Sequence, residues 1–296
     1  MHFAAVTKPA RCLTWVPRST EIPTVTAISC LVVGIDNHVG AYLARLLDAR
    51  GVGAGGGLGG VGGSLVTARL GIAEAVVAVA PTDTPRVAAQ SRLVFVISDG
   101  SAERADLVAE TLGAIGAAAR PARLLHIAEM ADLAIPVVRD TIRRIATTKR
   151  VERATLLLAA HDSRLGRRDT GMERIISAAA ADPHATRQKL TIAETGPRDW
   201  GWTAEYVDAV QRMAARDSMF DTVVASGHLL TMAEIAEFAF GYFRRTIAAD
   251  YLSITGAGTT IPPIDTTPLL AATGWRATTF GRDLVRALCE GAGDRN

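Results

Sequence analysis

The sequence predicts an α/β fold, in which a doubly wound parallel sheet is joined to a smaller mixed C-terminal lobe. Up to about residue 160, short apolar runs typical of buried strands alternate with segments of helical periodicity. Strands that alternate with helices form a parallel sheet with helices on both faces. Helical segments dominate beyond Met172, and this shift predicts the second lobe.

The predicted strands are short apolar runs, and the predicted helices have apolar residues at i, i+3 and i+4. The strands lie at 26–33, 75–79, 93–97, 122–127, 154–160 and 221–227. The helices lie at 40–50, 103–118, 133–147, 172–182, 203–216, 231–247 and 279–290. A glycine tract from Gly51 to Gly63 interrupts this order. Its composition predicts a flexible segment that is too poor in side chains to form a packed strand.

Composition and charge exclude several classes of protein. Apolar residues make up 49% of the chain and charged residues 21%, a mixture typical of globular proteins. The net charge of +2 comes without a dense Lys/Arg stripe, so we do not expect a nucleic-acid partner. No uncharged apolar run is long enough to span a bilayer, and charges interrupt the first 24 residues, so neither a membrane partner nor a signal peptide is expected.

The cysteines indicate a reducing compartment. Cys12, Cys30 and Cys289 are odd in number, far apart and in no C-x-x-C pair. This pattern predicts neither a disulfide framework nor a metal site, and it favours the cytoplasm.

A glycine-containing turn joins the first predicted strand to its helix. It runs Val33-Gly-Ile-Asp-Asn-His-Val-Gly40, and the strand-turn-helix context is what gives such a pattern meaning. Gly34 permits a tight turn, and Gly40 lets the helix pack closely on the strand. Asn37 stands where the middle glycine of a dinucleotide fingerprint would lie, and it adds bulk where backbone approaches the pyrophosphate. On this motif alone, a dinucleotide site and a plain βα turn are equally favoured.

Further motifs resemble the GDP-mannose 4,6-dehydratases, a family of extended short-chain dehydrogenases/reductases with a Rossmann fold. The resemblance rests on segments in the family's order, at Gly34–Arg50, Ala88–Ser91, His161–Ser163, Arg198–Ala209 and Asp221–Gly227. It is strongest in Arg198-Asp-Trp-Gly-Trp-Thr-Ala-Glu-Tyr-Val207, which is similar to the family's RDWG-x-x-x-[DE]-Y-V segment. The resemblance implies an irregular leader at 1–25, a dinucleotide-binding Rossmann domain at 26–160, and a substrate-binding lobe at 161–296 that also completes the sheet.

The resemblance also implies an activity, a cofactor and a set of site residues. A 4,6-dehydratase is a lyase that oxidises a nucleotide sugar at C4 with NAD(P), eliminates water across C5 and C6, and returns the hydride to C6. The matching positions are Gly34, Asn37, Gly40, Ala88 and Ala89 for the cofactor, Glu129 for catalysis, and His161, Arg174 and Arg198 for a nucleotide sugar of the GDP-mannose type. The cofactor is NADP or NAD, because the glycine tract replaces the loop that would distinguish them and Arg69 is isolated.

Three of the four catalytic groups of the family are replaced. No Tyr-x-x-x-Lys occurs in the chain, and the family's Tyr-Ala-x-Ala-Lys segment corresponds to Leu133-Ala-Ile-Pro-Val137. The catalytic Thr corresponds to Ile127, whereas Glu129 is kept. Without the Lys cation and the phenol, the base that takes the C4 hydroxyl proton is missing.

Simpler interpretations stand beside the functional ones. A glutamate such as Glu129 next to an apolar strand end is more often a solvated or capped carboxylate than a catalytic one. Arg198 and Asp199 are compatible with a surface ion pair, although the Trp-Gly-Trp context favours a binding or structural role, and the basic run 164–168 is compatible with a solvated loop. The helical stripe Ile235, Phe238, Ala239 and Tyr242 is typical of a core or of the dimer face of a homo-oligomer. Two hypotheses follow: a nucleotide-sugar dehydratase, or a non-catalytic homologue that binds a dinucleotide or nucleotide sugar or modulates an active partner.

Overall fold

The computed structural model describes residues 30–52, 54–57, 70–71, 76–118, 122–165, 170–181, 190–193, 196–247, 252–256, 258 and 262–293. The leader predicted at 1–25, Cys12 and Arg69 lie outside these residues, as do positions 166–168 of the basic run.

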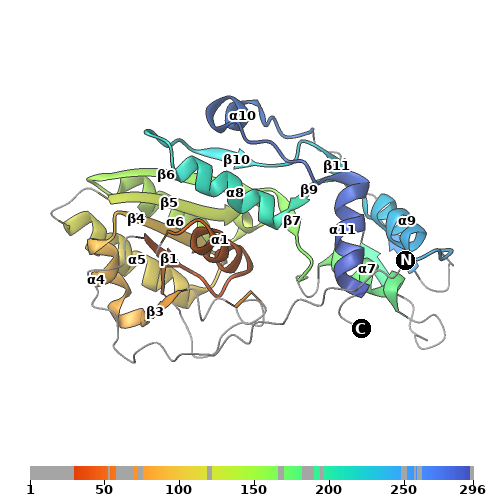
Figure 1. Ribbon diagram of the computed structural model, residues 1–296, viewed down its shortest axis with the longest axis horizontal. Helices are drawn as coiled ribbons and strands as arrows, with labels where there is room; N and C mark the ends of the chain where they lie inside the picture. The colour runs from red at the N-terminus through yellow and green to blue at the C-terminus, as the bar shows by residue number, and fades with distance from the viewer. Residues whose placement is uncertain are drawn as a thin grey trace, which may run out of the picture.

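Within the described residues, seven parallel strands form the central sheet, in the spatial order β10-β6-β5-β4-β1-β2-β3 (Figure 1). The strands are β1 (Cys30–Val33), β2 (Ala54–Gly57), β3 (Val77–Val79), β4 (Leu93–Ser98), β5 (Ala122–Glu129), β6 (Val151–Leu158) and β10 (Thr222–Val224). From β1 the chain adds β2 and β3 on one side, then returns and adds β4, β5, β6 and β10 on the other. This order is that of a doubly wound sheet and confirms the predicted fold class.

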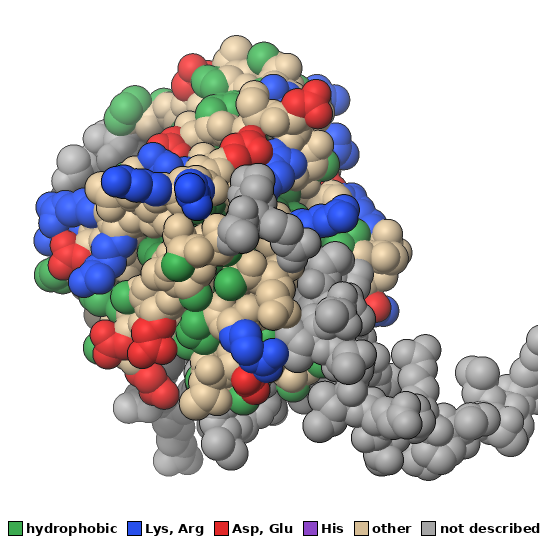
Figure 2. Space-filling model, turned by 90° about the vertical axis from the view of Figure 1, so that its left-hand side faces the viewer, with side chains coloured by type: hydrophobic (Ala, Val, Ile, Leu, Met, Phe, Trp, Pro, Cys, Tyr) green, Lys and Arg blue, Asp and Glu red, His purple; other side chains and the backbone are tan. Residues whose placement is uncertain are grey.

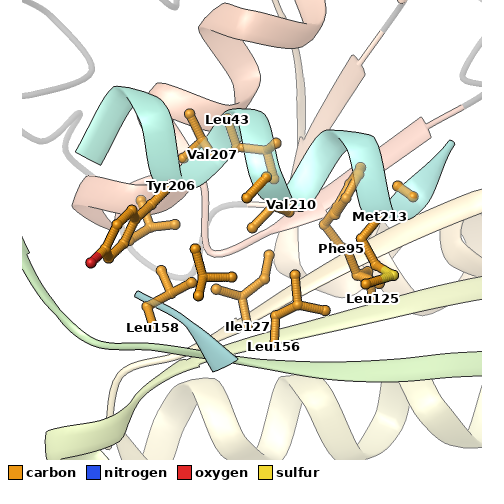
Figure 3. Close-up of a cluster of buried hydrophobic side chains, with 14 of the residues drawn as sticks. Leu43, Phe95, Leu125, Ile127, Leu156, Leu158, Tyr206, Val207, Val210 and Met213 are labelled. Atoms are coloured by element: carbon orange, nitrogen blue, oxygen red, sulfur yellow. The ribbon is translucent and has the colours of Figure 1, made fainter. Parts of the chain in front are cut away.

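Helices cover both faces of this sheet. Helices α1 (His38–Ala49) and α8 (Thr203–Ala214) pack on one face, and α4 (Thr84–Gln90), α5 (Ala102–Ala117) and α6 (Pro136–Thr147) on the other. Figure 3 shows the first of these layers, where Val207, Val210 and Met213 of α8 meet apolar side chains of β4, β5 and β6. Strand residues alternate between the two cores, so each central strand is apolar on both sides.

A second core lies in the C-terminal lobe. It is built from α7 (Gly171–Ala180), α9 (Met232–Tyr242) and α11 (Gly281–Gly293), which pack together beyond one end of the central strands (Figure 1). Two small sheets join this lobe, one with β7 (Ala160–Asp162), β9 (Arg198–Trp202) and β11 (Leu229–Leu230), the other with β8 (Leu190–Ala193) and β12 (Leu252–Thr255). Helix α10 (Thr267–Thr273) contacts β10 and α8, so part of the C-terminal half completes the main domain.

Most predicted elements are confirmed, and the glycine tract is the main error. Residues 54–57 of the tract form β2, which pairs with β1 and β3 in the middle of the sheet. The prediction assumed that a strand needs side chains to pack. Backbone hydrogen bonds to two neighbouring strands form without side chains, and they hold β2 in the sheet. The helix predicted at 133–147 is divided, because Pro136 begins α6 and a 3-10 turn, η3 (Met130–Ala134), precedes it.

Surface properties are unremarkable over the described residues. No helix among them has the length and apolarity that a membrane span requires. Basic and acidic side chains are interspersed on the face that Figure 2 shows. Of the apolar stripe on α9, Ile235 and Ala239 are buried in the lobe core while Tyr242 is exposed.

Candidate functional site

The glycine turn joins β1 to α1 by a tight connection. Gly34 has φ +94°, in the left-handed region that favours glycine. A Cβ added at Gly40 would lie 2.1 Å from the carbonyl oxygen of Gly34, so the helix approaches the strand as closely as backbone allows. Both glycines therefore have the roles that the sequence predicted for the turn.

Asn37 caps the helix that this turn begins. Its side-chain Oδ1 accepts a hydrogen bond of 2.9 Å from the backbone N–H of Val39. Amide groups at a helix N-terminus attract anions such as phosphate. Asn37 thus occupies one of the donors that a bound diphosphate would use.

An ion-pair cluster ties this turn to the loop after β4. Arg104, near the start of α5, donates to both carboxylate oxygens of Asp36, at 2.8 and 3.0 Å, and to Asp99 at 2.9 Å. Burial lowers the pKa of Arg104, but the hydrogen bonds and charges of the two carboxylates raise that pKa to a net value above its ordinary one. Arg104 is 8% exposed, and a Cβ on Gly34 would lie 3.0 Å from its Nη1. The guanidinium therefore covers the first glycine.

Ala88 and Ala89 do not join the turn. They lie on α4, which ends at Gln90 just before β4 begins at Leu93. That is the amino end of β4, whereas Gly34 follows the carboxyl end of β1, a parallel neighbour. The assignment of Ala88 and Ala89 to the cofactor site is thus corrected. The residues that the register brings to the turn are Ile97 and those after it.

A cavity of about 470 Å³ lies between the carboxyl ends of β5 and β6 and the C-terminal lobe. It is lined by residues from both sequence halves, among them Glu129, His161, Arg174 and Arg198. The structure therefore brings together the predicted catalytic residue and all three predicted substrate-binding residues. Arg174 and Arg198 are exposed at this cavity, whereas His161 is buried in its wall.

His161 links the cavity to the glycine turn through a chain of polar contacts. Its Nε2 lies 3.8 Å from Oε1 of Glu129, and its Nδ1 lies 3.0 Å from Oγ1 of Thr203 at the start of α8. The same hydroxyl lies 3.3 Å from Nε2 of His38, the first residue of α1. A hydroxyl has one proton, so it can donate to only one imidazole at a time and accepts from the other when both bonds form.

The RDWG segment holds the lobe on the main domain. Asp199 is 3% exposed and accepts bonds from both the backbone N–H and the hydroxyl of Ser226, at 2.7 and 2.8 Å, and from the backbone N–H of Gly227 at 2.7 Å. The Tyr206 hydroxyl also donates to this carboxylate, at 3.3 Å. Burial and the Asp199 charge raise the pKa of Tyr206 well above its ordinary value, so this phenol stays protonated. Asp199 is thus a buried structural carboxylate, and its interpretation as half of a surface ion pair is wrong.

Two more residues of this segment are fixed by packing and by hydrogen bonds. A Cβ on Gly201 would lie 2.3 Å from ring atoms of Tyr206. Glu205 accepts bonds from the backbone and hydroxyl groups of Thr278 and Thr279. Burial raises the pKa of Glu205, but these bonds outweigh it and the net pKa is lowered. The motif that carries the family resemblance therefore stabilises the fold.

The positions of the replaced catalytic groups are apolar in the structure as well. Ile127 is buried in the core beneath α8 (Figure 3). Val137 borders a small hollow with Ser98, Asp99 and Arg104. No tyrosine or lysine is among the described residues that line the cavity.

His126, one residue before Ile127, is a structural histidine. It is fully buried, and its Nε2 lies 2.8 Å from the hydroxyl of Ser98. Burial lowers the pKa of His126 to about 3, so the ring is neutral.

Sequence reasoning missed Asp36, Asp99 and Arg104 at the turn and Thr203 beside the cavity. An acidic residue at a helix start and an arginine in the next helix carry no motif of their own. Their pairing depends on β1 and β4 being neighbours. Thr203 lay within a recognised segment, but only the fold shows that it contacts two histidines.

The fold is that of the extended short-chain dehydrogenases/reductases, a class that contains nucleotide-sugar epimerases and dehydratases. The structure is similar to a UDP-glucuronic acid 4-epimerase from Bacillus cereus, solved with UDP-glucuronic acid and NAD (TM-score 0.71, 11% identity, 90% of this chain and 99% of that chain). It is also similar to a UDP-glucose-4-epimerase from Stenotrophomonas maltophila with bound NAD and formylated UDP-arabinopyranose (0.70, 16%, 90% and 98%). A third relative is an NAD dependent NDP-hexosamine 5,6-dehydratase of tunicamycin biosynthesis (0.68, 14%, 90% and 98%).

Within this class, residues 138–266 match the family model described as GDP-mannose 4,6 dehydratase. The match confirms the family resemblance found in the sequence, over less than half of the 296-residue chain. No curated protein matches the chain at a significant level.

Proposed function

We propose that the protein is a GDP-mannose 4,6-dehydratase-like homologue that binds a nucleotide sugar of the GDP-mannose type in the cavity. The observation that carries this proposal is the convergence of Glu129, His161, Arg174 and Arg198 on one cavity of about 470 Å³. That size suits a small-molecule site. Two exposed arginines give it a means to grip a diphosphate, since guanidinium groups bind phosphate oxygens bidentately.

NAD or NADP is the proposed cofactor. The backbone of the glycine turn suits the diphosphate of such a dinucleotide, but the side chains of the turn do not. The φ of Gly34 and the close approach at Gly40 leave the first amides of α1 facing the turn, where a diphosphate would bind. When bound, the dinucleotide would supply a hydride acceptor. The side chains oppose this fit. Asn37 accepts a hydrogen bond from the Val39 N–H, which is then not available to a diphosphate, and Asp36 adds a carboxylate to the turn. We therefore expect binding that is weaker than in an intact fingerprint.

The second hypothesis is a non-catalytic homologue, and the lining of the cavity favours it. No Tyr or Lys is among the described lining residues, and Leu133 and Val137, which correspond in the sequence to the family's Tyr and Lys, lie outside that lining. Oxidation at C4 needs a group that takes the hydroxyl proton as the hydride leaves. Without that group, binding is retained while 4,6-dehydration is lost.

Thermal shift with NAD⁺, NADP⁺, GDP-mannose and UDP-glucose, together with an assay for the 4-keto-6-deoxy product, separates these hypotheses. We expect GDP-mannose to raise the melting temperature and no product to form at an enzymatic rate. Replacing both Arg174 and Arg198 by Gln should abolish the GDP-mannose shift, and Arg143→Gln, on the exposed face of α6, should leave it unchanged. Product formation would contradict the loss of activity, and no shift with any nucleotide sugar would contradict the proposal itself.

The expected cytoplasmic location and homo-oligomeric state stay predictions from the sequence. Sedimentation of the purified chain across a concentration range tests the second of them. A single species with the mass of one 31.2 kDa chain at every concentration would contradict it.

A further inference from the structure

A second cavity, of about 460 Å³, lies near the amino ends of the strands at one edge of the central sheet. It is formed by the last turns of α6, the first half of β6 and the two residues before the edge strand β10. Its size suits a small molecule. The apolar residues of its lining are Ile142, Ile145, Ala146, Val151 and Phe220, and the polar ones are Arg153, Thr155 and Asp221.

The polar residues lie together because of the strand geometry of β6. Successive residues of a strand point to opposite faces of the sheet. Ala154 and Leu156 are buried in the core beneath α8, so Arg153 and Thr155 lie on the other face, beside α6. Asp221 is held next to Thr155, whose backbone N–H donates to its Oδ1 at 2.7 Å. Arg153 is two residues away on β6, about 7 Å along the strand.

The two charged side chains of this cavity keep hydrogen-bonding capacity for a ligand. Arg153 donates through Nη1 to the carbonyl oxygen of Thr148, at 3.0 Å, and through Nη2 to that of Ala146, which holds the guanidinium at the end of α6. A guanidinium has five N–H donors, so others remain. The second carboxylate oxygen of Asp221 has no partner among the described residues. Both side chains are exposed, and they form no ion pair with each other.

We propose that this cavity binds a free α-amino acid with an apolar side chain, such as leucine or phenylalanine. The carboxylate of the ligand pairs with Arg153, its ammonium group pairs with the second oxygen of Asp221, and its side chain lies against the apolar wall. A guanidinium and a carboxylate that are held apart match a zwitterion, whereas a ligand of a single charge would meet one like charge. The apolar lining selects for a large apolar side chain.

This cavity is separate from the one proposed for a nucleotide sugar. Arg153 lines the first and Leu158 the second, and five residues of strand β6 place them about 17 Å apart. The described residues that line the two cavities have no member in common. The inference therefore does not rest on the proposed function.

Calorimetric titration of the full chain with L-leucine and L-phenylalanine tests the proposal. We expect saturable binding of both at one site. N-acetyl-L-leucine lacks the cation and L-leucinamide lacks the carboxylate, so each should bind at least about tenfold more weakly, because each loses a hydrogen bond between charged groups. L-alanine keeps both charges but buries less apolar surface, and it should also bind at least about tenfold more weakly.

Asp221→Asn tests the contact with the ammonium group. The amide oxygen can still accept from the Thr155 N–H, while the charge is lost. We expect the affinity for L-leucine to fall at least about tenfold and the discrimination against N-acetyl-L-leucine to shrink. Asp140→Asn, on α6 but outside the cavity, is the matched control and should leave the affinity unchanged.

Arg153→Gln tests the contact with the carboxylate. The affinity for L-leucine should fall at least about tenfold, and the preference for L-leucine over L-leucinamide should shrink. Arg143→Gln, at an arginine of α6 outside the cavity, is its control. Because Arg153 also holds the end of α6, this variant is first checked for folding by its melting temperature. If it does not fold, the comparison of L-leucine with L-leucinamide on the wild-type chain decides this contact.

The remaining outcomes are equally decisive. Equal binding of L-leucine, N-acetyl-L-leucine and L-leucinamide overturns the recognition of a zwitterion. Binding that neither Asp221→Asn nor Arg153→Gln weakens overturns the location, and the absence of saturable binding overturns the proposal. GDP-mannose should leave the affinity for L-leucine unchanged, and competition between them would overturn the separation of the two cavities. A chain that binds L-leucine without any thermal shift by nucleotide sugars contradicts the proposed function alone.

Discussion

The glycine turn and the cavity lie at the same carboxyl edge of the sheet, yet their polar groups are arranged differently. At the turn the polar groups bind one another, since Asn37 caps α1 and Arg104 pairs with Asp36 and Asp99. In the cavity, Arg174 and Arg198 are exposed and Glu129 is partly so. The polar side chains of the turn form one cluster, whereas the charged side chains of the cavity lining are accessible from the cavity.

This difference shows which parts of the family resemblance the fold itself requires. Gly40, Gly201 and Asp199 are required by close contacts or by buried hydrogen bonds, so changing them would disrupt the fold. Ile127 is buried in the core. Leu133 lies in the 3-10 turn η3 and Val137 at the start of α6, two places where an apolar residue is compatible with the fold. The segments that carry the resemblance therefore include residues whose contacts stabilise the fold.

The largest expected effect is that of Gly40→Ala at the turn. Its Cβ would lie 2.1 Å from the Gly34 carbonyl oxygen and 2.9 Å from Cα of Ile35, so backbone must move. We expect a loss of about 3 kcal/mol or more in the free energy of unfolding, at the upper end of overpacking effects, measured by urea denaturation.

Gly113→Ala in α5 is the control for that substitution. No atom lies within 4 Å of the added Cβ, and the residue is exposed in a helix interior. Alanine there should stabilise the chain by about 0.5–1 kcal/mol. Similar losses for both variants would contradict the packing argument.

Asp199→Asn should have the next largest effect, and it probes the lobe side of the comparison. An amide replaces one of the two carboxylate oxygens by an NH₂ group, which then faces either the N–H of Gly227 or the donors of Ser226 and Tyr206. Because bonds to charged groups contribute about 1.5–3 kcal/mol each, we expect a loss of about 3 kcal/mol. Asp140→Asn, on the exposed face of α6, should change unfolding by less than about 0.5 kcal/mol. Equal effects of the two variants would show that Asp199 is not structural.

Arg104→Gln should destabilise the turn by about 2 kcal/mol. The change leaves Asp36 and Asp99 facing each other without a cation, although their side chains, 22% and 26% exposed, keep part of their hydration. Asp36→Asn in the same chain should restore part of the loss, which a double-mutant cycle measures. Strict additivity of the two changes would mean that the pair is not coupled.

Glu205 predicts a pH dependence in the RDWG segment. Its pKa in the folded chain is below the ordinary 4.5, so its contribution to stability is complete above about pH 4.5 and is lost as pH falls through the lower folded value. Glu205→Gln should therefore reduce the acid dependence of the melting temperature in this range. Parallel curves for wild type and variant would contradict the lowered pKa.

The fold could be predicted from the sequence where a pattern has one structural solution. The apolar runs and helical periodicities located β1, β4, β5, α5 and α8 because burial imposes those spacings. The glycine tract misled, since β2 depends on hydrogen bonds to β1 and β3 that no local composition reveals.

The site could be predicted only where a motif fixed the position of its residues. Glu129, His161, Arg174 and Arg198, which the resemblance named, come from β5, β7, α7 and β9 and line one cavity. Ala88 and Ala89 matched a motif in sequence but lie on a helix at the opposite end of β4. Arg104 and Thr203 gain their partners from residues 68 and 42 positions away, and only the three-dimensional arrangement determines such pairs.

The smallest expected change in stability, from Asn37→Gly, is the sharpest test of the difference between the two regions. Glycine is nearly as good as asparagine at a helix N-cap, so the free energy of unfolding should fall by only a few tenths of a kcal/mol. The substitution also frees the Val39 N–H, which now donates to Oδ1 of Asn37. It removes a side chain from the part of the turn whose backbone would contact a diphosphate. One more charge-assisted hydrogen bond, worth about 1.5 kcal/mol, corresponds to roughly tenfold tighter binding of NAD⁺ by calorimetry. The affinity of the cavity for GDP-mannose should not change. If Asn37→Gly leaves NAD⁺ affinity unaltered, the side chain of Asn37 does not limit the turn, and the Asp36 carboxylate becomes the group that sets its affinity.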